Sequence, residues 1–392
     1  MQESKPTSPF LYGIKPEVID YYRKSTSEVS KLLGHNSGNI LFVRAIYEHT
    51  DPCCIADWDE ELSRTDLQSK TCIIPSANFL GPHADMGFMN SKIKNFEGLI
   101  LSIGLGSQSD DSNRPLSIPA GTREWLDIIS SKCKPNTQNI AVRGSSTLND
   151  LDAIGMAGNA VITGCPSNFL SDDPRLGESI ARKLPHIFER VCVASGHYKW
   201  DYLKSIEQDL LKLASETGGF YVMQSPSEMI ALGLNKLQEM DVSVQEAIRC
   251  FCYPESSSEE FEKLVRRIFK VYLNVSDWML DMSKHSLVIG ARIHGVMAGI
   301  QAGVPSLCIA HDPRTIELCQ EMKIPYLTRE QVTSGLDKAK VAQALDIDWN
   351  AYDRRRALLL ERYYSFLASN GVTPSRCLAR LKAQLCEQQA GS

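Results

Sequence analysis

The chain has 392 residues, of which 43% are hydrophobic and 23% are charged, and its formal net charge is −5. This composition is that of a globular protein with room for two domains, and it excludes a disordered chain and a disulfide scaffold. Because a mildly acidic protein does not attract nucleic acid as a whole, we expect no nucleic-acid partner. An anionic ligand would have to be held by a local group of donors.

The sequence pattern predicts a cytoplasmic protein without a transmembrane segment. Residues 1–9 are polar and lack the apolar core of a signal peptide. The most apolar stretch, residues 286–310, contains Arg292, His294 and Gln301, which disfavours a membrane span. The twelve cysteines include no CxxC pair, so neither a zinc site nor a redox motif is indicated. We therefore expect reduced thiols and no metal.

Short apolar runs alternate with Gly/Ser/Asn turns and amphipathic stretches, which is the rhythm of β-α-β units with parallel sheets. In the first half, this pattern predicts strands over residues 71–75, 98–103, 139–142 and 160–163. In the second half, it predicts strands over 190–194, 219–223, 286–290 and 306–310, and helices over 203–216, 259–272 and 295–302.

A boundary near residues 184–189 divides the two series. We expect an N-terminal Rossmann-like domain over 1–186, on the acceptor side, and a C-terminal Rossmann-like domain over 187–347, on the donor side. Helices predicted over 348–367 and 375–388 form a tail, residues 348–392, that packs back on the N-terminal domain. The alternative for the tail is contact with a membrane surface, because three arginines at 354–356 lie beside several tyrosines.

The segment over residues 286–319 is the most informative. Arg292 and His294 lie where a buried strand gives way to a helix, and Asp312 and Arg314 follow the next strand. Carboxyl ends of parallel strands and helix N-termini are natural anion sites. From periodicity alone, the alternative is an ordinary salt-bridge arginine and a helix-capping histidine.

This segment resembles the polysaccharide pyruvyl transferase family. The match consists of Gly290-Ala-Arg292-Ile293-His294-Gly295, then Gly303-Val-Pro305, then Asp312-Pro-Arg314-Thr315-Ile-Glu317. Weaker similarities are Asn36-Ser-Gly38-Asn39, Asn78-Phe-Leu, Gly104-Leu-Gly106-Ser107, Val142-Arg143 and Gln224-Ser-Pro-Ser-Glu228. Asn39 stands where the family has aspartate, so a role that needs a charge at this position is in doubt.

The resemblance implies an α/β fold of two Rossmann-like domains with parallel sheets that face each other across a cleft, as in GT-B-type glycosyltransferases. It also implies that phosphoenolpyruvate is the donor, that a sugar is the acceptor, and that the product is a cyclic pyruvate ketal. The acceptor would belong to a cell-surface polysaccharide or to its precursor, which in some cases is lipid-linked. No cofactor is implied beyond the co-substrate phosphoenolpyruvate.

The family places the donor at Arg292, Ile293 and His294, with a further arginine for which Arg143 is our candidate. We expect further donor contacts from Gly295, Arg314 and Thr315. The residues that we expect on the acceptor side or in the cleft are Asn36, Gly38, Asn78, Gly106, Ser107, His197 and Gln224. The turn at residues 104–107 could also cradle a phosphate. We leave His35 and His83 as surface residues.

The reaction requires a proton on the vinyl carbon of the donor and the removal of protons from two sugar hydroxyls. Histidine suits such proton transfer, so His294 is our candidate for the general acid or for a phosphate ligand. Asp312 and Glu317 are candidates for deprotonating or orienting the acceptor. The alternative for Glu317 is a helix salt bridge with Arg314.

Two other functions stay open from the sequence. One is a GT-B-type glycosyltransferase that uses a nucleotide sugar. The other is a non-catalytic sugar-binding relative that kept the fold, which the replacement at Asn39 leaves open.

Overall fold

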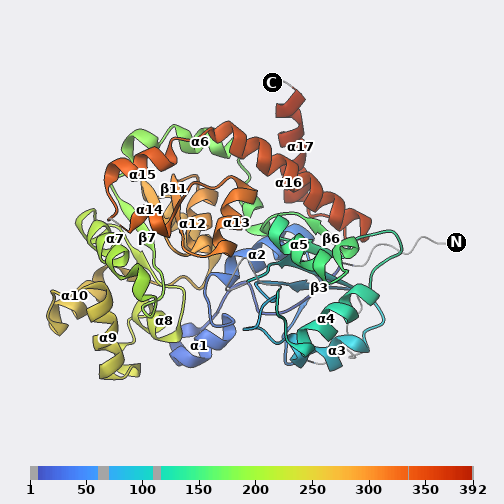
Figure 1. The fold of residues 1–392 in the computed structure, drawn as a ribbon, viewed down its shortest axis with the longest axis horizontal. Helices are drawn as coiled ribbons and strands as arrows, with labels where there is room; N and C mark the ends of the chain where they lie inside the picture. The colour runs from blue at the N-terminus through green and yellow to red at the C-terminus, as the bar shows by residue number, and fades with distance from the viewer. Residues whose placement is uncertain (1–7, 61–69, 109–115, 334, 391–392) are drawn as a thin grey trace.

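The computed structural model describes residues 8–60, 70–108, 116–333 and 335–390. Within them lie two six-stranded sheets, and every strand pairing in both sheets is parallel. Helices pack around both sheets (Figure 1). This arrangement confirms the predicted α/β fold with two parallel sheets.

The sheet of the N-terminal half has the strand order β2-β1-β3-β4-β5-β6. Its strands are β1 (Phe10–Tyr12), β2 (Ile55–Ala56), β3 (Thr71–Pro75), β4 (Leu99–Leu105), β5 (Ile140–Val142) and β6 (Ala160–Ile162). The helices of this half are α1 (Thr26–Leu32), α2 (Asn39–Thr50), α3 (Asn90–Lys94), α4 (Ala120–Ser131), α5 (Ser145–Ala153) and α6 (Leu176–Ala181). The sequence pattern located β3 to β6 and missed β1 and β2.

The sheet of the C-terminal half has the strand order β12-β11-β10-β7-β8-β9. Its strands are β7 (Val191–Ala194), β8 (Tyr221–Val222), β9 (Phe269–Lys270), β10 (Leu287–Gly290), β11 (Ser306–Ala310) and β12 (Tyr326–Thr328). The α-helices of this half are α7 (Lys204–Glu216), α8 (Ser227–Gly233), α9 (Val242–Cys252), α10 (Ser258–Ile268), α11 (Val275–Met282), α12 (Ile293–Gln301), α13 (Pro313–Met322), α14 (Arg329–Val332) and α15 (Lys338–Leu345).

Two predicted helices have different limits in the structure. The helix expected over 259–272 ends at Ile268, because Phe269 and Lys270 pair with β8 as a strand. The helix expected to open at Gly295 begins at Ile293. His294 therefore lies in the first turn of α12 rather than in the loop before it.

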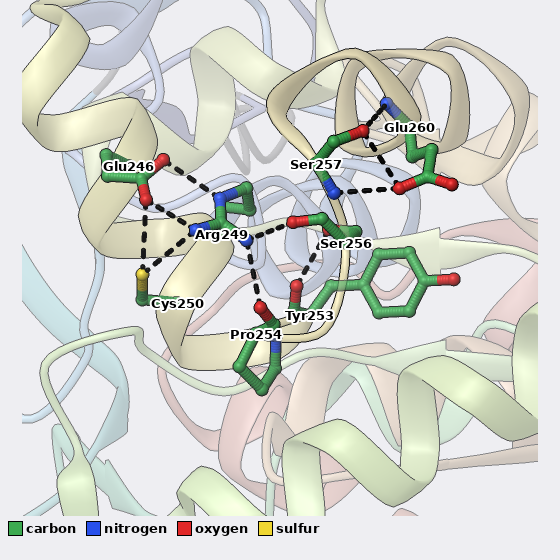
Figure 2. Close-up of polar contacts among 8 residues, drawn as sticks. All are labelled: Glu246, Arg249, Cys250, Tyr253, Pro254, Ser256, Ser257 and Glu260. Atoms are coloured by element: carbon green, nitrogen blue, oxygen red, sulfur yellow. Dashed lines mark hydrogen bonds and ion pairs between the residues drawn. The ribbon is translucent and has the colours of Figure 1, made fainter.

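The connection between α9 and α10 is held by local polar contacts at the edge of the C-terminal half (Figure 2). Arg249 forms an ion pair with Glu246 at 2.5 Å and donates to the carbonyl groups of Pro254 and Ser256. Ser257 and Glu260 then form a capping box that starts α10. These contacts explain the sharp corner between the two helices, which lies away from the interface between the sheets.

The tail consists of α16 (Trp349–Ser369) and α17 (Arg376–Ala390), which return to the N-terminal half (Figure 1). Helix α16 packs against α6 and β6, and α17 packs against α2. At the start of α17, the backbone N–H of Ser375 donates to the carbonyl group of His49 at 2.8 Å. The chain therefore crosses between the two halves twice.

The arginines of the tail, on which the alternative of a membrane contact was based, have partners within the protein. Arg356 is fully buried and donates to three backbone carbonyl groups, those of Asn168, Ser171 and Asp173. Its neighbours Arg354 and Arg355 form ion pairs with Asp348 and Glu321. None of the helices in the described part of the chain has the length and apolar character that crossing a bilayer requires.

Replacing Arg356 with alanine should destabilise the protein strongly. Three buried carbonyl groups would lose a charged donor, and an unsatisfied buried group costs about 1–3 kcal/mol. We expect the free energy of unfolding, measured by urea denaturation, to fall by about 3 kcal/mol or more. Arg354→Ala, at an exposed position of the same helix, should change it by less than about 0.5 kcal/mol. Equal effects of the two variants would contradict this account of Arg356.

Candidate functional site

A cavity of about 50 Å³ lies between the two halves and is lined by residues from both. We call it the arginine cavity. The N-terminal half contributes Asn36, Asn39, Ala77, Asn78 and Arg143, and the C-terminal half contributes Gln224, Ala291, Arg292, Ile293, His294, Arg314 and Leu318.

Three arginines reach this cavity because each follows the carboxyl end of a parallel strand. Arg143 comes directly after β5, Arg292 comes after β10 and precedes α12, and Arg314 lies in the first turn of α13 after β11. Ligands of open parallel sheets bind at this edge. The structure therefore brings together the three arginines that the sequence proposed for the donor.

Arg143 is buried and fixed from the N-terminal half. Its Nη1 donates to Oδ1 of Asn78 at 2.9 Å, and its guanidinium carbon lies 5.5 Å from the centre of the Phe42 ring. A Cβ atom on Gly106 would lie 2.8 Å from Asn78 Oδ1 and 3.2 Å from Arg143 Cδ. Gly106 thus makes room for this pair. Burial, together with the charge of Arg314, lowers the pKa of Arg143.

Arg292 and Arg314 are fixed from the C-terminal half. Nη2 of Arg292 donates to Oγ of Ser225 at 2.6 Å, and its guanidinium carbon lies 4.7 Å from the centre of the Trp200 ring. Burial, and then the charge of Arg314, lower the pKa of Arg292 to about 10. Nη2 of Arg314 donates to Oδ2 of Asp312 at 3.0 Å.

The positive charge around the cavity is not fully compensated. The Nε atoms of Arg143, Arg292 and Arg314 are buried and find no acceptor in the described part of the chain, and neither does Nε2 of Gln224. Asp312 is the carboxylate that pairs with one of these arginines. Because buried donors and charges are costly when unpaired, the arrangement is suited to a compact anion with more than one negative charge.

His294 joins the same group from the first turn of α12. Its ring centre lies 5.4 Å from that of Phe42, and its Nε2 lies 3.8 Å from Sγ of Cys165. Burial lowers the pKa of His294 well below its usual value, and the charges of Arg143, Arg314 and Arg292 lower it further. The imidazole is therefore neutral until an anion offsets the arginine charges.

Gln224, Asn36 and Gly38 lie where the two halves meet. The backbone N–H of Ser37 donates to the carbonyl group of Gln224 at 2.9 Å. A Cβ atom on Gly38 would lie 2.5 Å from Oε1 of Gln224, and one on Gly295 would lie 2.7 Å from its Nε2. The two glycines thus allow the close approach that forms the cavity.

Several expected site residues have other contacts. The N–H groups of Gly106 and Ser107 donate to Ala77 and Thr147, so this turn does not offer free donors to a phosphate. Asp312 caps α13 by accepting from the N–H of Thr315 at 2.7 Å, which leaves Thr315 a structural partner of this carboxylate.

His197 follows β7 and lies beside Trp200 rather than in the lining of the cavity. Burial and the charge of Arg292 lower its pKa to about 4. His35 and His83 are exposed, as expected, although His83 lines a second, larger hollow described below.

Glu317 joins the two halves instead of facing the cavity. Its carboxylate accepts from the backbone N–H of Thr147 at 2.8 Å and from the Thr147 hydroxyl at 3.2 Å. It therefore caps α5, whose own N-cap is Gly144, and a Cβ atom on Gly144 would lie 2.6 Å from Glu317 Oε1. Among the described residues the alternative salt bridge with Arg314 is not formed. The capping contact gives Glu317 a structural role, and its expected action on the acceptor stays a prediction. Burial raises the pKa of Glu317.

Sequence reasoning missed the residues that support the arginines from the side. Phe42, Trp200 and Cys165 contact Arg143, Arg292 and His294, and none of them stands in a recognisable motif. An aromatic cluster at residues 198–202, directly after a strand end, was the one available signal.

A sequence model of the family described as Polysaccharide pyruvyl transferase matches residues 18–313. The chain belongs to this family. The match includes Arg143, Arg292 and His294. It confirms the resemblance inferred from the motifs. No curated protein matches the sequence.

Solved structures resemble the chain in fold alone. UDP-GlcNAc 2-epimerase from Neisseria meningitidis, bound to UDP-GlcNAc, is 10% identical with a TM-score of 0.44, covering 91% of this chain and 99% of that one. The epimerase from Rickettsia bellii is 11% identical with a TM-score of 0.43, and the match covers 93% of this chain and 96% of that one. The wall teichoic acid polymerase TagF is 10% identical with a TM-score of 0.39, and the match covers 98% of this chain and 89% of that one.

Variants of Glu317 distinguish a cap from a proton acceptor. Glu317→Gln keeps an oxygen for the Thr147 N–H and a nitrogen for its hydroxyl, so stability and transferase activity should stay close to those of the wild type. Glu317→Ala leaves the start of α5 uncapped and should cost about 1–2 kcal/mol in urea denaturation. If Glu317→Gln folded normally but lost activity, a proton-transfer role would be restored.

Proposed function

We propose that the protein transfers pyruvate from phosphoenolpyruvate to a sugar of a cell-surface polysaccharide or its precursor, forms a cyclic ketal and releases phosphate. Family membership supports the transferase class. The observation that carries the donor is the group of three buried arginine Nε atoms without an acceptor around one small cavity. Because this donor is a metabolite of the cytoplasm, we place the reaction there.

Phosphoenolpyruvate fits the charge of the arginine cavity. It carries a phosphate and a carboxylate, and guanidinium groups bind both through paired hydrogen bonds. Ile293 supplies an apolar wall beside these groups.

The proposed reaction proceeds in three steps. His294, charged once the donor is bound, protonates the methylene carbon, and the adjacent carbon becomes electrophilic. A sugar hydroxyl adds to that carbon and loses its proton, and the phosphate then leaves with the electron pair of its C–O bond. A second hydroxyl of the same sugar adds and loses its proton, which closes the ketal. Asp312, which forms an ion pair with Arg314, is our candidate for accepting a hydroxyl proton.

Removal of one cavity arginine should weaken donor binding. Each charge-assisted hydrogen bond contributes about 1.5–3 kcal/mol, so Arg292→Met or Arg143→Met should raise the Kd for phosphoenolpyruvate about 10- to 100-fold in calorimetry. Arg267→Met, at an exposed site away from the cavity, is the control and should bind normally. Release of phosphate and a product mass increase of one pyruvate less one water, with a panel of sugars, would establish the reaction. Tight binding without any product would favour the non-catalytic relative.

Donor binding should charge His294. Its pKa lies well below the usual value in the empty site, and a bound multivalent anion raises it, so binding near pH 7 should take up protons. Calorimetry in buffers of different ionisation enthalpy measures this uptake. His294→Asn should abolish it and reduce turnover by about 10²- to 10⁴-fold. Equal uptake by this variant and the wild type would assign the proton to another group.

A further inference from the structure

A larger hollow of about 480 Å³ opens on the N-terminal half next to the arginine cavity. We call it the aromatic hollow. Asn36, Asn39, Ala77 and Asn78 line both spaces, so the two adjoin. The other lining residues are Ile14, Gly34, Phe42, Val43, Trp58, Pro75, Phe79, His83, Ala84, Asp85, Met86 and Phe88. A molecule in the hollow would have one end beside the donor.

Aromatic side chains give this hollow its character. Phe88 is 51% exposed, although large apolar side chains usually avoid water. Its ring packs edge-on against Trp58, with ring centres 5.9 Å apart. Trp58 is held in place, because its indole N–H donates to the carbonyl group of Tyr12 at 3.3 Å and its own carbonyl group accepts from Lys92 Nζ at 2.5 Å. The exposed ring of Phe88 and the fixed ring of Trp58 together form an apolar surface on which the apolar face of a ligand can pack.

The remaining polar lining consists of amides, a carboxylate and the imidazole of His83, whose Nε2 lies 2.9 Å from the carbonyl oxygen of Asn78. Asn36, Asn39 and Asn78 supply amide groups, and Asp85 supplies a carboxylate. Among the lining residues that the structure describes, there is no lysine or arginine. This is the opposite of the neighbouring arginine cavity, where three arginines converge. The two adjoining spaces thus differ in the charge of the ligand that each can accept.

We infer that the aromatic hollow binds the acceptor and selects an uncharged pyranose rather than a hexuronic acid or a phosphorylated sugar. A pyranose has an apolar C–H face that packs on aromatic rings and a rim of hydroxyls that pair with amides. Asn78, which lines both spaces, also accepts from Arg143 at 2.9 Å and so links the sugar site to the donor site. This inference rests on the proposed function, because a bound sugar is an acceptor only if the protein transfers pyruvate to it.

Charge opposes an acidic sugar in the hollow. A hexuronic carboxylate would lose water without gaining a lysine or arginine partner among the described lining residues, and it would lie near the carboxylate of Asp85. It would also compete with the donor for the arginines. An uncharged hexose or N-acetylhexosamine avoids both costs.

Binding of methyl glycosides to the full chain tests this inference without requiring turnover. Methyl β-D-glucopyranoside, methyl β-D-galactopyranoside and methyl N-acetyl-β-D-glucosaminide are the uncharged probes, and methyl β-D-glucuronopyranoside is the matched acidic probe. We expect saturation-transfer NMR and titration to detect at least one uncharged probe and to show at least tenfold weaker binding of the glucuronide. Binding of the glucuronide as tightly as the glucoside, or of no uncharged probe, would overturn the inference.

Variants locate the binding. Phe88→Ala should weaken glycoside binding at least fivefold and leave the Kd for phosphoenolpyruvate within twofold. Tyr22→Ala, which removes another exposed ring of the same half outside the hollow, is the control and should change neither. Asp85→Asn keeps the oxygen that accepts from the Gly87 N–H, and it should narrow the difference between the glucoside and the glucuronide. Unchanged glycoside binding by Phe88→Ala would contradict this site.

The two proposals fail in different ways. If glycosides bind in the hollow but phosphoenolpyruvate does not bind or react, the proposed donor is wrong and the sugar site stands. If phosphoenolpyruvate is bound and transferred but Phe88→Ala leaves the KM for the acceptor sugar unchanged, the proposed function stands and the aromatic hollow is not the acceptor site.

Discussion

The arrangement of the protein depends on an excess of positive charge that is buried between two halves. Three guanidinium groups converge on a small cavity, and their Nε atoms lack acceptors among the described residues. Such a group is costly in isolation, because each cation lowers the pKa of its neighbours and none can be fully hydrated. Phe42 and Trp200 reduce this cost by offering ring faces to two of the cations. A multivalent anion would remove the rest, so part of the binding energy for such an anion is already stored in the empty site.

Both halves contribute residues to this positively charged site. Arg143 and Phe42 come from the N-terminal half, and Arg292, His294 and Arg314 come from the C-terminal half. The halves are joined by the contact of Glu317 with Thr147 and by the hydrogen bond from Ser37 to Gln224. Three glycines permit these contacts. A Cβ atom on Gly144 would clash with Glu317, and one on Gly38 or Gly295 would clash with Gln224. The site is therefore a property of the assembled pair of sheets.

The sequence predicted the parts of this structure that depend on local pattern. Buried parallel strands are continuous apolar runs, so β3 to β6 and β10 and β11 could be located, and the Arg292–His294 turn stood out because charges there interrupt such runs. Strand β9 was missed because it directly follows α10 and continues its helical pattern. The role of Glu317 could not be read locally either, because its partner Thr147 lies 170 positions away. The aromatic hollow was missed for the same reason, since Trp58 and Phe88 come together only through the fold.

The double crossing of the chain limits how the halves can move. The chain passes from the N-terminal to the C-terminal half before β7. It returns to the N-terminal half through α16, which packs on α6 and β6. A body attached at two separate points can rotate about the line through both attachments, but it cannot twist or slide freely. Any opening that admits substrate should therefore be a rotation of one half about the line through both attachments. On closing, such a rotation returns the arginines of the two halves to the same relative positions.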